Sequence, residues 1–281
     1  MKVFIIGVGL IGGSLAKDLK SIGDFQITGI DKNKLNLNFA LKDGIIDRLG
    51  KINEINKANI VILSVDVESA IDLLPKILTL INNNCLVIDF GSTKGKLCSL
   101  VSDHPKRNQF LATHPIAGKE NSGPQHASSY LFKDKIQIIC ESDKTRKDLF
   151  DLAKSIFNQI GMNLRYMEPN ENDKNMAYVS HLSHISSFML GKTVLEIEKT
   201  KNIIDLAGSG FESTVRLAKS SPEMWAPIFK QNKKNVTKAL DDYINNLLDF
   251  KKKILKNEFD DLKNQMKEIN KLTKILNRNK Q

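Results

Sequence analysis

GVGLIGG, residues 7–13, lies between two segments of different character and decides the fold. The apolar run KVFII at 2–6 is typical of a buried strand, and SLAKDLKSI at 14–22 has the spacing of an amphipathic helix. Three of the glycines form the pattern G-x-G-x-x-G, namely Gly7, Gly9 and Gly12. A glycine turn between a strand and a helix predicts a dinucleotide site, with the pyrophosphate at the helix N-terminus.

The three glycines have separate tasks in such a turn. Gly7 permits the tight turn, Gly9 lets the backbone approach a pyrophosphate, and Gly12 allows close packing of helix on strand. Leu10 and Ile11 lie between the last two glycines, so we expect them to contact the cofactor as well.

Asp31 ends the second predicted strand, about 20 residues after the glycines, where an acidic residue accepts hydrogen bonds from a ribose diol. Its carboxylate would repel a 2′-phosphate. We therefore expect NAD rather than NADP, although Lys32 and Lys34 follow closely. The alternative is a plain glycine turn beside a solvated Asp31.

Short apolar runs alternate with helical segments through the first half of the chain. The runs lie at 2–6, 25–30, 60–65, 85–89, 110–113 and 136–140. This alternation predicts a Rossmann-type α/β domain, with a mostly parallel sheet covered by helices on both faces. After residue 170 the strand-like runs stop and helical patterns such as 176–195 take over. We therefore expect an NAD-binding domain at 1–165 and an all-α domain at 166–281.

Ligands of open parallel sheets bind outside the carboxyl ends of the strands. The residues expected there after the third and fourth strands are Ser64, Val65, Ser92 and Lys94. His114 ends the fifth strand, and Pro115 is expected to turn the chain out of the sheet at that point. Plainer interpretations also exist, in which Ser92 caps a helix and the His-Pro step is only a turn.

The composition limits the class of protein. With 41% hydrophobic and 26% charged residues, the chain is typical of a soluble globular protein. Three scattered cysteines form neither a disulfide framework nor a zinc motif, which favours a reducing cytoplasm. No stretch reaches the ~18 apolar residues of a membrane span. Four glycines interrupt the N-terminal apolar run, which argues against a signal peptide.

The net charge of +10 raises the question of nucleic-acid binding. Residues 251–281 carry ten Lys and Arg against four Asp and Glu, so much of the excess lies in this tail. The tail has few aromatic residues to stack on bases and no zinc-finger spacing. We expect neither a nucleic-acid nor a membrane partner.

Five stretches together resemble the prephenate/arogenate dehydrogenase family of tyrosine biosynthesis. They are GVGLIGGSLA, DFGSTKGK, THPIAGKENSG, VSHLSH and GSGFESTVRLAKSSPEMW, which extend from Gly7 to Trp225. The resemblance implies a Rossmann domain and a helical domain that forms an intertwined homodimer. It also implies the NAD-dependent oxidative decarboxylation of prephenate to 4-hydroxyphenylpyruvate and CO₂.

The resemblance assigns roles to individual residues. His114 accepts the proton of the substrate's ring hydroxyl, with Ser92 as a second hydrogen-bond partner; an imidazole suits this task. Arg216 pairs with a substrate carboxylate. His184 lies at the substrate with His181 close by, and no metal is expected there, because no carboxylate or thiol lies at ligand spacing. The further expected substrate contacts are Lys119, Glu120 and Trp225.

Several interpretations stay open. The chain has Phe90, Ser183 and Ser213 where other residues are common in the family, and none of these departures removes a predicted catalytic group. Those near Arg216 leave arogenate dehydrogenase and a dual-specificity cyclohexadienyl enzyme as alternatives. Trp225 is equally a core residue by its pattern. From another class, the alternative is a non-catalytic nucleotide- or nucleic-acid-binding protein.

Overall fold

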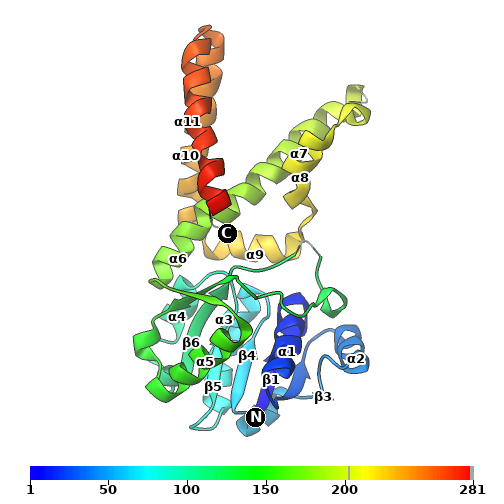
Figure 1. Ribbon diagram of the computed structural model, residues 1–281, viewed down its shortest axis with the longest axis vertical. Helices are drawn as coiled ribbons and strands as arrows, with labels where there is room; N and C mark the ends of the chain where they lie inside the picture. The colour runs from blue at the N-terminus through cyan, green and yellow to red at the C-terminus, as the bar shows by residue number, and fades with distance from the viewer. Residues whose placement is uncertain (120, 202, 279–281) are drawn as a thin grey trace. The chain divides into compact units, whose positions relative to one another are not determined.

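The computed structural model describes residues 1–119, 121–201 and 203–278. The chain divides into two compact units, Met1–Lys233 and Lys234–Gln281 (Figure 1). The first unit carries a sheet and the helices around it, and the second is helical.

The sheet of the first unit has 8 strands in the order β3-β2-β1-β4-β5-β6-β7-β8. The strands are β1 (Lys2–Ile6), β2 (Gln26–Ile30), β3 (Arg48–Leu49), β4 (Ile60–Leu63), β5 (Leu86–Asp89), β6 (Phe110–Pro115), β7 (Ile136–Cys140) and β8 (Asn163–Tyr166). All neighbours are parallel except β6 and β7. The predicted Rossmann-type sheet is confirmed. Strands β3 and β8 were not predicted, since one has two residues and the other reads NLRY.

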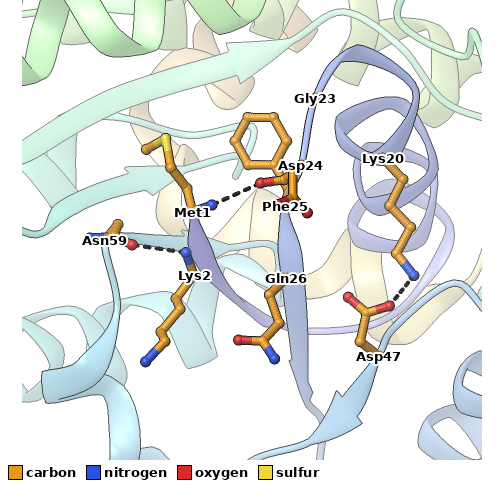
Figure 2. A pocket seen from close by; sticks show the side chains of 9 residues that line it. All are labelled: Met1, Lys2, Lys20, Gly23, Asp24, Phe25, Gln26, Asp47 and Asn59. Carbon is orange, nitrogen blue, oxygen red and sulfur yellow. Dashed lines mark hydrogen bonds and ion pairs between the residues drawn. The ribbon is translucent and has the colours of Figure 1, made fainter.

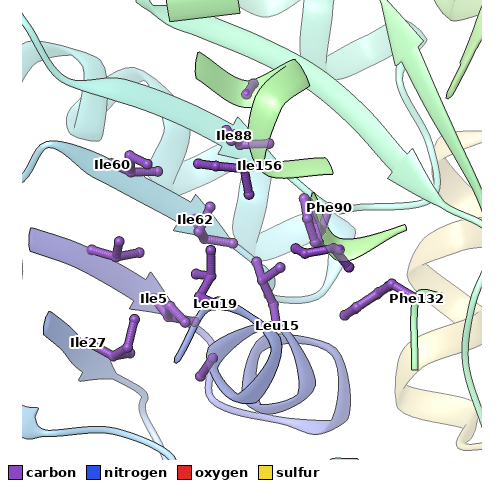
Figure 3. Packing of buried hydrophobic residues seen from close by; sticks show 14 of the residues in the cluster. Ile5, Leu15, Leu19, Ile27, Ile60, Ile62, Ile88, Phe90, Phe132 and Ile156 are labelled. Atoms are coloured by element: carbon purple, nitrogen blue, oxygen red, sulfur yellow. The ribbon is translucent and has the colours of Figure 1, made fainter. Parts of the chain in front are cut away.

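Helices cover both faces of this sheet. They are α1 (Leu10–Ile22), α2 (Lys34–Lys42), α3 (Val67–Leu80), α4 (Gly95–Leu100) and α5 (Lys147–Ile160). Alternate residues of β1 belong to different cores: Val3 and Ile5 pack in one cluster, Phe4 and Ile6 in the other. Figure 3 shows the first cluster, in which Leu15 and Leu19 of α1 face the sheet. Burial on both faces explains the continuous apolar runs of the strands.

A helical segment completes the first unit. It comprises α6 (Pro169–Met176), a π-helical turn η5 (Ala177–His181), α7 (Leu182–Lys201), α8 (Ser209–Val215), the 3₁₀ turn η7 (Arg216–Lys219) and α9 (Pro222–Gln231). Pro222 stands in the first turn of α9 after Ser221, as its pattern predicts. The domain boundary at 165 stays a prediction.

The second unit contains α11 (Phe259–Arg278) and all of α10 (Lys233–Leu255) except its first residue. Leu262 is buried, and Lys253 Nζ donates to Gln265 Oε1 at 3.3 Å. Within the described residues of both units, no helix combines the length and apolar character that crossing a membrane requires.

The expectation that Pro115 leaves the sheet is wrong. Pro115 pairs with Gln137 in the antiparallel β6–β7 ladder, and Ile116 N still donates to Ile136 O at 2.8 Å. Pairs in such a ladder alternate, so the pair next to 116–136 exchanges no hydrogen bonds. Pairing of β6 with β5 has already ended at Ala112. The missing N–H of Pro115 therefore leaves no gap in the sheet.

Candidate active site

The glycine turn has the shape that a pyrophosphate needs. Gly7 has φ +93, and an added Cβ would collide with the carbonyl oxygen of Ser64. At Gly12 a Cβ would collide with the Gly7 carbonyl oxygen, whereas at Gly9 it would meet nothing within 4 Å. Helix α1 begins after Gly9 without a capping side chain or an acidic residue in its first turn. Open space beside an uncapped helix N-terminus fits a phosphate group.

Two side chains brace this turn. Ser64 Oγ donates to Gly7 O at 2.7 Å. Asp31 follows β2 directly, and its Oδ2 accepts from Val8 N at 2.8 Å while its Oδ1 accepts from Asn33 N at 2.8 Å. A carboxylate oxygen has two lone pairs, so Asp31 keeps the capacity to accept from a ribose diol. The residues present therefore fit a dinucleotide without a 2′-phosphate.

His114 lies near the carboxyl end of β6, with 8% of its surface exposed. Its Nδ1 is 3.0 Å from Asn172 Oδ1 on α6. Burial, the largest influence, lowers the pKa of His114 to about 3, although the hydrogen bond to Asn172 acts in the opposite direction. The imidazole is therefore neutral at pH 7, as a proton acceptor must be.

Ser92 lies on the loop after β5, and its buried Oγ has no hydrogen-bond partner within the described part of the chain. It does not cap α4. Asp173 of α6 does so instead, accepting from Lys94 N at 2.7 Å and from Gly95 N at 2.9 Å. Asn172 Nδ2 donates to Ser92 O at 3.0 Å. The start of the helical segment thus holds both the Ser92 loop and His114.

Lys94 does not lie on the rim of the site, contrary to expectation. Its side chain is fully buried and pairs with Asp89 at the end of β5. A buried ammonium requires such a partner, because the cost of removing a charge from water is large. Lys94 is therefore part of the support beneath the Ser92 loop.

The rings of His181 and His184 both lie next to the ring of Trp225. The His184 ring lies 3.7 Å from the Trp225 ring at an interplanar angle of 30°, and the His181 ring lies 5.7 Å away, edge-on. Phe229 of α9 completes an aromatic cluster at 5.4 Å from Trp225. Burial lowers the pKa of both histidines, that of His181 to about 4. Trp225 is buried, yet its Nε1 has no partner among the described atoms.

The structure describes the surroundings of two further expected substrate contacts, Arg216 and Lys119. Arg216 is exposed at the start of η7, a turn that Ser187 of α7 anchors by donating to Thr214 O and accepting from Ala218 N. Lys119 is exposed on the loop after β6 and donates to Ser128 Oγ at 2.9 Å. Glu120 lies outside the described residues. The substrate roles of these three residues stay predictions.

Sequence reasoning missed Asn172, Asp173 and Asn232. All three are buried polar residues, and Asn232 Nδ2 contacts both Asp173 O at 2.6 Å and His181 Nδ1 at 3.3 Å. The sequence offers little signal, because PNENDKNM reads as an exposed polar helix.

A separate hollow lies at the other end of the strands, where β1 and β2 begin (Figure 2). Met1 and Gln26, at the amino ends of β1 and β2, line it together with Lys20 and Asp47, which form an ion pair. Cofactors of open parallel sheets bind at the carboxyl ends, so this hollow is not the predicted site.

Two family models match consecutive parts of the chain. The nucleotide-binding domain of prephenate dehydrogenase matches residues 15–166, and the dimerization domain of prephenate dehydrogenase matches residues 168–268. The prephenate dehydrogenase of Bacillus subtilis is 32% identical over 86% of this chain and 67% of its own length. The cyclohexadienyl dehydrogenase of Zymomonas mobilis is 26% identical over 96% of this chain and 94% of its own length.

A solved structure is similar over almost the whole chain. It is prephenate dehydrogenase from Aquifex aeolicus in complex with hydroxyphenyl propionate and NAD+, with 33% identity, a TM-score of 0.89 and 96% of each chain covered. The glycine turn and its surroundings agree with this relationship. The chain therefore belongs to the prephenate dehydrogenase family of oxidoreductases.

Proposed function

We propose that the chain catalyses the NAD-dependent oxidative decarboxylation of prephenate to 4-hydroxyphenylpyruvate and CO₂. The observation that carries this proposal is the neutral, buried His114 at the carboxyl end of β6, with its Nδ1 already occupied by Asn172. The similarity to a prephenate dehydrogenase crystallised with hydroxyphenyl propionate and NAD+ supports it.

The residues of the chain divide the work of the reaction. His114 accepts the proton of the ring hydroxyl through Nε2, the nitrogen that Asn172 leaves available, and returns it to the phenolic oxygen after CO₂ has left. The unpartnered Ser92 Oγ supplies a second hydrogen bond to this hydroxyl or to the imidazole. Loss of CO₂ makes the ring aromatic, so the remaining task is orientation. We assign it to Arg216, which pairs with a carboxylate, and to the His184–Trp225 stack.

A bound NAD would supply the hydride acceptor for the ring carbon that carries the hydroxyl. The glycine turn of Gly7, Gly9 and Gly12 would hold the pyrophosphate of NAD, assisted by Leu10, Ile11, Ser64 and Val65, and Asp31 would hold the adenosine ribose. We propose that the active form is a homodimer built through the C-terminal helical domain, residues 166–281, as the match of a dimerization domain to residues 168–268 supports.

Arogenate is the alternative substrate, because relatives named for a broader cyclohexadienyl activity also match. Arogenate carries an ammonium where prephenate has a keto group, and an acid at position 213, three residues before Arg216, would favour it. Ser213 is neutral and donates to Gly210 O at 2.9 Å, which supports prephenate.

The test measures NADH formation by the purified full chain with prephenate and with arogenate, using NAD and NADP in turn. We expect the highest kcat/KM with prephenate and NAD. Equal rates with both substrates would establish a cyclohexadienyl enzyme, and a preference for NADP would remove the role of Asp31. No turnover with either substrate would refute the proposal.

A further inference from the structure

A buried polar network joins the two candidate catalytic groups to the start of the helical segment. Asn172 is at its centre and is fully buried. Its Oδ1 lies 3.0 Å from His114 Nδ1, and its Nδ2 lies 3.0 Å from Ser92 O and 2.9 Å from Asp173 Oδ1. One amide therefore contacts the imidazole, the Ser92 loop and the residue that caps α4.

The partners of this amide determine which way it points. Ser92 O and Asp173 Oδ1 only accept hydrogen bonds, so the amide atom facing them must be the NH₂ group. The atom facing His114 is then the amide oxygen, which only accepts. His114 Nδ1 must donate to it, and the neutral ring carries its proton on Nδ1.

The same reasoning gives the opposite result for His181. Asn232 Nδ2 donates to Asp173 O, a carbonyl oxygen, so the group facing His181 Nδ1 is also an NH₂ group. His181 Nδ1 accepts, and its proton lies on Nε2. The contrast shows that the surrounding amides, and not burial alone, select each tautomer.

We propose that Asn172 is a positioning residue, which holds His114 in the Nδ1–H tautomer and fixes the imidazole relative to the Ser92 loop. The inference rests on the proposed role of His114 as proton acceptor. With Nδ1 protonated, the lone pair of Nε2 is the basic site of the ring. Rotation of the imidazole about the Cβ–Cγ bond of His114 would break the hydrogen bond to Asn172. Deleting the amide oxygen removes both constraints.

The charged and titratable groups around the His114 ring favour a neutral imidazole. Besides burial, the ammonium of Lys94, from the loop after β5, and His181, from η5, both lower the pKa of His114. The hydrogen bond from His114 to Asn172 is the influence that raises this pKa. An uncharged acceptor at position 172 orients the ring without forming an ion pair that would stabilise the protonated, inactive form.

The first test needs no variant. The ¹⁵N spectrum of the histidine-labelled full chain at neutral pH distinguishes a protonated from an unprotonated ring nitrogen, and His114→Asn assigns the His114 signals. We expect Nδ1–H for His114 and Nε2–H for His181. An Nε2–H tautomer at His114 overturns the proposal, whether or not the enzyme is active.

The second test compares two leucine substitutions on α6. Asn172→Leu preserves size and removes the acceptor, and Asn175→Leu makes the same change at an exposed position of the helix. We expect Asn172→Leu to lower kcat by about 10- to 100-fold with little change in the KM for prephenate, and to mix the His114 tautomers. A purely structural role predicts a lower melting temperature with kcat and the tautomer unchanged, and this result would overturn the proposal.

Asn172→Asp keeps an acceptor for His114 Nδ1 and adds a charge, and it replaces the NH₂ group that faces Ser92 O and Asp173 Oδ1 with an oxygen. We expect it to recover the Nδ1–H tautomer and to move the acidic limb of the kcat/KM profile to higher pH, because a carboxylate raises the pKa of the imidazole. An acidic limb at the wild-type position would count against contact between residue 172 and the ring. If His114→Asn itself kept full turnover, the proposed function would fail, while the tautomer measurement would still report on Asn172.

Discussion

Two regions of the first unit hold histidines in different ways. At the carboxyl edge of the sheet, His114 is tied by a hydrogen bond to Asn172, which also holds the Ser92 loop. In the aromatic cluster, formed by His181, His184, Trp225 and Phe229, the His184 ring stacks on Trp225, and its Nδ1 lies 3.0 Å from the backbone carbonyl oxygen of Ser180. The His114 ring is thus fixed by a side chain from a distant segment, whereas the His184 ring is hydrogen-bonded within its own helical turn and stacks on an aromatic face.

Under the proposed function, this difference corresponds to two tasks. A proton acceptor must meet a moving proton within hydrogen-bond distance, so it gains from a fixed direction. A surface that orients a ring-shaped substrate gains from aromatic area and from an unsatisfied donor such as Trp225 Nε1. We therefore expect changes at the sheet edge to alter kcat and changes around the helices to alter KM.

The largest effect should follow from His114→Asn. We expect turnover to fall by roughly 10²–10⁴, the usual loss with a general base, while NAD binding persists because the glycine turn is intact. His104→Asn, a partly exposed histidine after α4, is the matched control. Steady-state rates and NAD titration measure the two properties. Near-normal turnover in His114→Asn would contradict the role of His114 as proton acceptor.

Lys94→Met tests the support beneath the Ser92 loop. Removing the ammonium leaves Asp89 buried without its partner, so the free energy of unfolding should fall by about 3–5 kcal/mol at neutral pH. The loss should shrink as the pH falls, because the pKa of Asp89, already raised by burial, allows the carboxyl to take up a proton. Urea denaturation of Lys94→Met and of the exposed Lys96→Met measures this, and equal stabilities would contradict it.

Arg216→Ala tests the helical side of the comparison. A charge-assisted pair with a carboxylate contributes about 1.5–3 kcal/mol, so the KM for prephenate should rise roughly 10- to 100-fold with kcat nearly unchanged. Lys219→Ala removes another exposed cation from the same turn and should leave KM unaltered. A fall in kcat at constant KM would assign Arg216 to the chemical step and contradict the expected separation of kcat effects from KM effects.

The fold was predictable because its signals are local. The run KVFII, the glycine turn and the following helix each have a pattern that matches their structure, and both faces of β1 are buried as continuous apolar runs predict. Position along this framework also located Ser92 after β5 and His114 near the end of β6.

The buried polar residues that hold the site in place were not predictable, because their burial depends on contacts between distant segments. Asn172 and Asp173 lie in a helix with no apolar face, and they are buried only because the Ser92 loop and His114 present matching polar groups. Lys94 follows Ser92 by two residues, so its position in the sequence predicted a place on the rim of the site. In the structure its side chain is buried, because Asp89 provides a buried partner. Periodicity reports apolar burial and does not register buried hydrogen bonds.

Per pH unit, the smallest effect is a difference in the acid sensitivity of folding. Burial lowers the pKa of His114 to about 3 and that of His181 to about 4, against about 6.5 for an unfolded histidine. Since the unfolded chain binds protons more readily, stability present above pH ~6.5 is lost as the pH falls through this window. Each histidine contributes up to about 1.4 kcal/mol per pH unit. Urea denaturation at several pH values should show a shallower slope in both His114→Asn and His181→Asn, one histidine from each region. An unchanged slope in only one variant would mean that its histidine is accessible to protons in the folded chain, and that the two regions differ in burial as well as in bonding.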